Sequence, residues 1–127
     1  MDKAALNALL KPKSIAVVGA SATPGKIGYT VIKNLLDSEF EGKIYPINPT
    51  ADEILGLKVY PSVKDIPGKV EAAIITIPAK LVLSVIDDLG QKGVKGMMVI
   101  TSGFSEIGEK ELELELVRRS NAYGMRV

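Results

Sequence analysis

Three short runs of apolar, largely β-branched residues restrict the folds that this sequence can adopt. They are "SIAVV" at residues 14–18, "EAAIITI" at 71–77 and "GMMVIT" at 96–101. Continuous apolar runs of this length are typical of strands that are covered on both faces, as in parallel sheets. We therefore expect a parallel sheet that contains these three strands.

Helix-like segments separate the apolar runs. Residues 26–40 carry apolar side chains at helical spacing, and residues 79–93 form a helical segment that Gly93 closes. Residues 109–124 alternate leucine with glutamate, which is a strand pattern, but good helix formers and the order of charges favour a helix. We also expect a helix at residues 2–10 and strands at 43–48, at 58–62 near a sheet edge and at 125–127, where the last is cut short.

This alternation predicts an α/β fold of the Rossmann-like, doubly wound kind, with a parallel sheet and helices on both faces. A chain of 127 residues is long enough for one domain with a core, residues 1–127, and too short for two. Ligands of such sheets bind beyond the carboxyl ends of the strands. The loops expected to converge there are residues 19–28, 48–49, 77–79 and 101–103.

Composition excludes several classes of function. Sixteen basic and fifteen acidic residues give a net charge of +1, which offers no general attraction for nucleic acid. The chain has no cysteine and no histidine, so disulfides and thiol chemistry are excluded. The most apolar region, residues 72–86, is interrupted by Pro78 and Lys80 and predicts no membrane span. Residues 1–14 lack a signal-peptide core, which predicts a cytoplasmic location.

The loop "GASATPGKIG" at residues 19–28 follows the first strand and is a candidate phosphate site. Gly19 and Gly25 permit a tight turn and the close approach of backbone N–H groups to an anion. The helix N-terminus that follows favours negative charge, to which Lys26 adds a cation. Ser21 stands where G-x-G-x-x-G needs glycine, and the P-loop pattern also fails. A βα turn that binds nothing remains an alternative.

The second strand ends in "INP" at residues 47–49. Domains that bind NAD carry an acidic residue at this point, which holds the ribose hydroxyls. The neutral Asn48 does not repel a phosphate on the ribose, so the sequence favours coenzyme A or NADP. An ordinary turn residue before Pro49 is the alternative interpretation.

Five segments, taken in order, carry a resemblance to a known family. They are "KPKSIAVVGASATPGKIGYTVIKNLL", "YPINP", "EILGLKVYPSVKDIP", "AAIITIPA" and "VITSGFSEIGE". Together they resemble the CoA-binding domain of the NDP-forming acyl-CoA synthetases, a family that includes ADP-forming acetyl-CoA synthetases and is similar to the α subunit of succinyl-CoA synthetase. The resemblance runs from about residue 5 to the last residue and implies a Rossmann-like domain with coenzyme A as its ligand.

The resemblance also implies the roles of individual residues. It places the CoA phosphates in the loop Gly19–Gly25, which includes Ala20, Ser21 and Thr23. It places the adenosine end beside Asn48 and Pro49, the adenine or pantetheine against Ile77 and Pro78, and the pantetheine arm along Ile100, Thr101 and Ser102. Many relatives have lysine one residue after Asn-Pro, where this chain has Thr50. Either another cation such as Lys26 compensates, or phosphate binding at that point is weaker.

The family reaction relays phosphate through a histidine, which this chain lacks. We therefore predict no catalytic residue and no metal ligand here, and expect an N-terminal fragment of an ADP-forming acid–CoA ligase whose remaining domains or subunits are its partners. One alternative is a stand-alone module that senses CoA or acyl-CoA, and full gene length would distinguish the two. The other is an NADP-binding redox domain, which would bind NADP more tightly than CoA.

Overall fold

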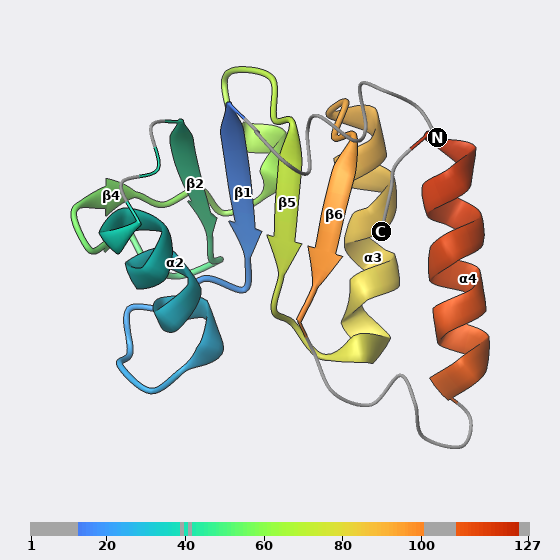
Figure 1. Cartoon of the computed structure of the whole chain (residues 1–127), viewed down its shortest axis with the longest axis horizontal. Helices are drawn as coiled ribbons and strands as arrows, with labels where there is room; N and C mark the ends of the chain where they lie inside the picture. The colour runs from blue at the N-terminus through green and yellow to red at the C-terminus, as the bar shows by residue number, and fades with distance from the viewer. Residues whose placement is uncertain (1–12, 39, 41, 101–108, 125–127) are drawn as a thin grey trace.

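The computed structural model describes residues 13–38, 40, 42–100 and 109–124, and its centre is a parallel four-stranded sheet (Figure 1). The strands lie in the order β2-β1-β5-β6 and span Lys43–Ile47, Ser14–Val18, Ala72–Ile75 and Gly96–Val99 respectively. From β1 the chain moves first to one side, to β2, and later to the other side, to β5 and β6. This reversal between β1 and β5 is the hallmark of a doubly wound sheet. The predicted fold class is confirmed.

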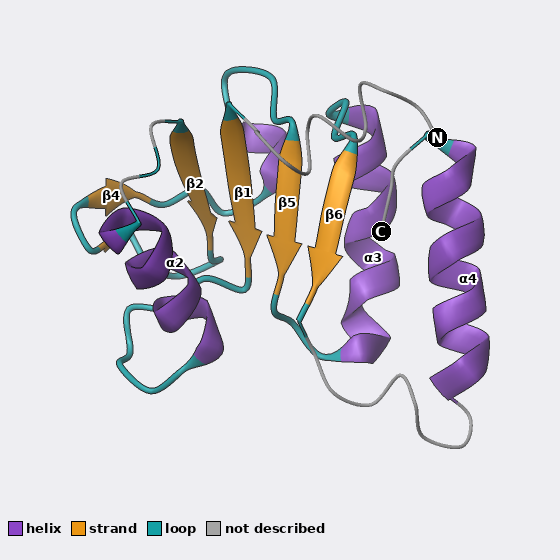
Figure 2. Cartoon of the chain, in the orientation of Figure 1, coloured by secondary structure: helices purple, strands orange, loops and turns teal. Residues whose placement is uncertain are grey.

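The apolar runs form β1, β5 and β6, and both faces of the sheet are covered at its centre, at β1. The expectation that β6 is covered on both faces is wrong in part, because Met98 of this edge strand is 54% exposed among the described residues. All five residues of β1 are buried. Ile15 and Val17 pack in one core with Ile32 of α2 (Ile27–Asp37). Ala16 and Val18 pack in a second core with side chains of α3 (Ala79–Gln91). The two helices therefore cover opposite faces, and Figure 2 shows them on either side of the central strands.

The segment with alternating leucine and glutamate forms a helix, α4 (Glu109–Ala122), as its charge order indicates. It packs against α3 (Figure 2). Gly90 of α3 makes the contact possible, because the Tyr123 ring lies where a Cβ atom of residue 90 would be. The Tyr123 hydroxyl donates a hydrogen bond to Asp87 Oδ1 at 3.0 Å, which raises the pKa of Tyr123 above its usual value.

Gly90→Ala is expected to destabilise the domain by about 1–2 kcal/mol, although alanine is the better helix former. The added methyl would overlap the Tyr123 ring and push α4 away from α3. Thermal unfolding followed by circular dichroism measures the loss. Gly68→Ala is the control, because no atom lies within 4 Å of a Cβ there. Equal melting temperatures for the two variants would contradict this packing.

Residues 53–62 differ from the sequence-based expectation of a strand at 58–62. The chain forms a hairpin of β3 (Glu53–Ile54) and β4 (Leu57–Lys58), joined by a two-residue turn. Both turn residues have positive φ, +50° at Leu55 and +84° at Gly56, as the turn preferred in tight hairpins requires. Beyond β4, Tyr60 forms a single parallel bridge with Ile47, and Pro61 has no N–H to continue the pairing.

The remaining boundaries shift by a few residues. The described part of α2 ends at Asp37 and α3 at Gln91, so both are shorter than predicted. A short 3₁₀ helix, η1 (Val63–Asp65), precedes β5. The helix expected at residues 2–10 and the strand expected at 125–127 lie outside the described residues. Within the described ranges no helix has the length and apolar character needed to cross a membrane.

Candidate functional site

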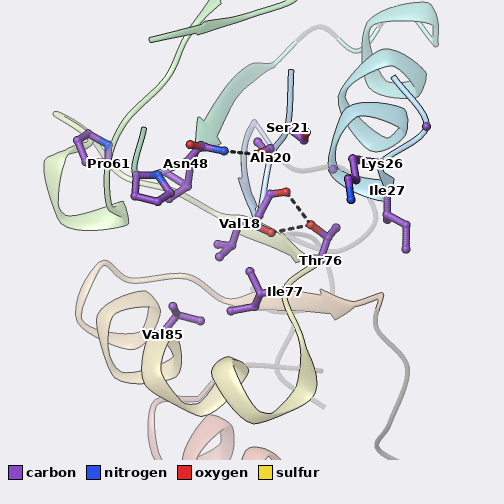
Figure 3. Close-up of a pocket in the computed structure, with 15 residues that line it drawn as sticks. Val18, Ala20, Ser21, Lys26, Ile27, Asn48, Pro61, Thr76, Ile77 and Val85 are labelled. Carbon is purple, nitrogen blue, oxygen red and sulfur yellow. Dashed lines mark hydrogen bonds between the residues drawn. The ribbon is translucent and has the colours of Figure 1, made fainter. Parts of the chain in front are cut away.

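A cavity of about 600 Å³ opens at the carboxyl edge of the sheet, beside the point where the strand order reverses (Figure 3). Loops after β1, β2 and β5 form it together with the start of α2. Eight of the residues predicted from the sequence line this cavity: Gly19, Ala20, Ser21, Gly25, Lys26, Asn48, Pro49 and Ile77. The topology therefore brings the first three of the expected loops to one place.

Three of the other predicted residues do not line the cavity, and two lie outside the described residues. Thr23, Pro78 and Ile100 are described but are not among its lining residues, and Thr101 and Ser102 lie outside the described residues. The backbone of Ile100 continues the pairing of β6, because its N–H donates to the Ile75 carbonyl at 2.8 Å. The binding roles of all thirteen residues stay predictions.

The N-terminus of α2 faces the cavity, and neither a side-chain cap nor an acidic residue of its first turn offsets its partial positive charge. Lys26 occupies the N-cap position in an extended conformation, its side chain makes no capping hydrogen bond, and the first turn holds no acidic residue. The first N–H groups of a helix have no partner within the helix. Figure 3 shows the Lys26 side chain beside this end of α2. The N–H groups, the helix dipole and the ammonium group together favour an anion.

Two glycines allow the loop after β1 to lie directly on its neighbours. A Cβ atom at Gly28 would overlap the carbonyl oxygen of Gly19 and lie 2.9 Å from its carbonyl carbon. Gly19 itself has φ +90°, and a Cβ atom there would lie 2.5 Å from Thr76 Oγ1. The loop is thus held between α2 and the end of β5. Gly25 has φ +94° but no atom within 4 Å of a Cβ position, so it faces open space.

Thr76 fixes this loop to the sheet, a role that the sequence did not reveal. Its hydroxyl lies 3.0 Å from the carbonyl oxygen of Val18 and 3.1 Å from that of Gly19, and it donates one proton between them (Figure 3). Pro61 and Val85 also line the cavity and were not predicted. The signal for Thr76 is its place directly after β5 at the reversal point. Nothing local in the sequence marks the other two.

Asn48 links the loops after β1 and β2. Its side-chain amide Nδ2 donates to the Ala20 carbonyl at 2.8 Å (Figure 3). Its Oδ1 accepts from the backbone N–H of Thr50 at 2.8 Å, from that of Ala51 at 2.9 Å and from the Thr50 hydroxyl at 3.1 Å. The residue predicted to meet the ribose therefore also holds two loops of the site in register.

The opposite wall of the cavity is apolar. Val18, Pro61, Ile77 and Val85 line it, and in Figure 3 Ile77 and Val85 lie away from Lys26. An anion site next to an apolar wall suits a ligand that joins a phosphate group to a large uncharged part. A doubly wound sheet with this cavity at its reversal point defines a nucleotide-binding domain of the Rossmann class.

Comparison with known proteins identifies the family within this class. The family model described as "CoA binding domain" matches residues 13–127, and the chain belongs to this family. The chain is 52% identical to the alpha subunit of acetate–CoA ligase (ADP-forming) I from Pyrococcus furiosus, over 96% of this chain and 28% of that protein. It is 50% identical to acetate–CoA ligase (ADP-forming) II from Archaeoglobus fulgidus, over 96% of this chain and 18% of that protein.

A solved structure agrees with these relatives. The dinucleotide forming acetyl-coenzyme A synthetase 1 of Ca. Korarchaeum cryptofilum, in complex with phosphate and ADP, superposes with a TM-score of 0.92 at 59% sequence identity. The match covers 98% of this chain and 27% of that one. The chain thus spans between 18% and 28% of the length of these relatives.

Proposed function

We propose that this chain binds coenzyme A in the cavity after β1, β2 and β5, as the CoA-binding domain of a longer ADP-forming acid–CoA ligase. The observation that carries the proposal is the uncapped N-terminus of α2, which lies with Gly25 and Lys26 beside an apolar wall. The diphosphate of CoA suits the helix N-terminus, and its uncharged pantetheine arm suits Ile77 and Val85.

The charge of the cavity supports CoA over NAD. No carboxylate is found among the described residues that line the cavity, and Asn48 takes the position where NAD-binding domains carry an acid. A phosphorylated ribose therefore meets no repulsion from the loop after β2. Family membership and the acetate–CoA ligase names of the relatives favour CoA over NADP.

The domain holds and orients CoA, and the remaining domains or subunits of the parent enzyme supply the chemistry. The chain has no histidine that could relay a phosphoryl group. Its described residues bind the diphosphate and direct the pantetheine arm along an apolar surface, which excludes water from the arm. The cytoplasmic location expected from the sequence stays a prediction.

Calorimetric titration with CoA, NADP and NAD tests the proposed function. We expect CoA to bind most tightly, since the family and the neutral loop after β2 both favour it. Tighter binding of NADP would overturn the proposal in favour of a redox domain. Absence of binding by all three would contradict the proposal that this chain holds CoA by itself.

Gly25→Ala and Gly56→Ala form a matched pair that separates binding from stability. Both glycines have strongly positive φ, +94° and +84°, and neither has an atom within 4 Å of a Cβ position. Each variant should therefore lose about 1–2 kcal/mol of stability from backbone strain. Only Gly25 lines the cavity, so only Gly25→Ala should weaken CoA binding, by about tenfold for one lost charge-assisted contact. Chemical denaturation measures the loss of stability, and calorimetry measures CoA binding. If the two variants bound CoA with equal affinity, Gly25 would not contact the ligand.

A further inference from the structure

One side chain at the end of β5 reaches the loop after β1. The Thr76 hydroxyl lies within hydrogen-bond distance of two carbonyl oxygens, that of Val18 at 3.0 Å and that of Gly19 at 3.1 Å (Figure 3). The Val18 carbonyl also accepts from the Thr76 backbone N–H at 2.8 Å. For the Gly19 carbonyl, the Thr76 hydroxyl is the one donor that the described part of the chain provides. The hydroxyl is therefore more important for Gly19 than for Val18.

The Gly19 carbonyl is also in contact with the first turn of α2. A Cβ atom at Gly28 would overlap its oxygen, so the backbone of the helix lies directly against it. The N–H of the same peptide group belongs to Ala20 and donates to the Ile47 carbonyl at 3.1 Å. This peptide group is thus held by β5 at its oxygen and by β2 at its nitrogen, and α2 packs on it. Its orientation determines where α2 begins.

Loss of the Thr76 hydroxyl would leave the Gly19–Ala20 peptide group held at its nitrogen alone. A carbonyl that loses its donor is destabilised, and turning toward water in the cavity reduces that cost. The first turn of α2 would then shift relative to the apolar wall at Ile77. A binding site needs its groups held within about 0.5 Å of the productive arrangement. The affinity for a ligand that spans both parts of the cavity therefore depends on this hydroxyl.

We propose that Thr76 is a positioning residue of the site: its hydroxyl places the start of α2 through the Gly19 carbonyl and thereby sets how tightly the ligand is held. The inference rests on the proposed function and adds a residue for which the sequence predicted no role. Thr76 lines the cavity, but backbone carbonyls use the proton of its hydroxyl. The effect therefore needs no hydrogen bond donated to the ligand.

Two substitutions at Thr76 separate the hydroxyl from the rest of the side chain. Thr76→Val keeps the shape and removes the donor, and it should weaken CoA binding by about tenfold. Thr76→Ser keeps the donor and removes the methyl group, and its CoA affinity should stay within about threefold of the unchanged chain. Calorimetric titration with CoA measures both. A loss in Thr76→Ser as large as that in Thr76→Val would overturn the role given to the hydroxyl.

Ser14→Ala is the matched control, because Ser14 joins the same two strands at the opposite edge of the sheet. Its hydroxyl donates to the Lys69 carbonyl at 3.2 Å and accepts from the Glu71 N–H at 3.0 Å, just before β5. Ser14→Ala should lower the denaturation midpoint, as Thr76→Val does, and leave CoA affinity unchanged. Equal losses of CoA affinity in the two variants would mean that both act through stability, and would overturn the inference.

Amide spectra of the isotope-labelled chain without ligand test the route through Gly19. Thr76→Val should shift the amide signal of Gly28 at the start of α2, and Ser14→Ala should leave it in place. An unshifted Gly28 signal in Thr76→Val would overturn the inference. If Thr76→Val bound CoA as tightly as the unchanged chain, the inference alone would fall. If the unchanged chain bound no CoA, the proposed function would fall, and the ligand role of Thr76 with it.

Discussion

Gly28→Ala is expected to destabilise the domain by about 2 kcal/mol and to weaken CoA binding by about tenfold or more. In a helix this substitution ordinarily stabilises by about 1 kcal/mol, because alanine is the better helix former. Here the added methyl group would overlap the carbonyl oxygen of Gly19. The loop after β1 would have to move away from α2, and the N–H groups at the start of the helix would lose their position relative to the loop.

Chemical denaturation and calorimetric titration with CoA measure the two losses. Asn34→Ala is the matched control, because it places alanine at an exposed position of the same helix. That variant should be stabilised by a few tenths of a kcal/mol, about the difference in helix propensity, with unchanged CoA binding. A stabilised Gly28→Ala variant with normal CoA affinity would contradict the close packing of α2 on the loop.

Asn48→Asp is expected to cost about 1–3 kcal/mol of stability and to weaken CoA binding by about tenfold or more. The carboxylate cannot donate a hydrogen bond, so its oxygen would face the Ala20 carbonyl oxygen at the position that Nδ2 now holds, 2.8 Å away. The loops after β1 and β2 would then repel each other. The new negative charge would also oppose the phosphates of the ligand.

The same two measurements apply to Asn48→Asp. Asn121→Asp makes the same chemical change at an exposed position in the last turn of α4, where the helix dipole makes it cost at most about 1 kcal/mol, and it should leave CoA affinity unchanged. If Asn48→Asp kept the stability of the unchanged chain, the hydrogen bond to Ala20 would not hold the loops together. If it kept full CoA affinity as well, the loop after β2 would not be part of the site.

The sequence predicts the parallel sheet because burial of the central strands leaves a direct signal, whereas the order of the strands in the sheet came from the structure. After Ser14, β1 is apolar, since its alternate side chains enter two different cores. The alternating leucines and glutamates of α4 are a strand pattern, but the segment was predicted as a helix. Its helix propensity and the order of its charges are stronger signals than the alternation. The β3–β4 hairpin was not predicted, since Leu55 is an unusual residue for a positive φ.

The part of the cavity that was predicted from the sequence is the part formed by residues at strand ends and by glycines. Gly19, Gly25 and Lys26 follow a strand and precede a helix, which fixes their place at the edge of the sheet. Pro61 and Val85 enter the cavity through tertiary packing, which no local pattern encodes. The internal hydrogen bonds of Asn48 likewise depend on loops that are distant in sequence, residues 20 and 48, meeting in space.

Amide chemical-shift mapping of the isotope-labelled chain during titration with CoA tests the central claim most directly. The account predicts the largest shifts at the amides of Gly25, Lys26, Ile27 and Gly28, where the helix N-terminus meets the diphosphate. A second groove of about 290 Å³, beside β2 and β4 and lined by Tyr45 among others, should remain unaffected. Shifts confined to that groove, with none at the start of α2, would contradict the assignment of the CoA site.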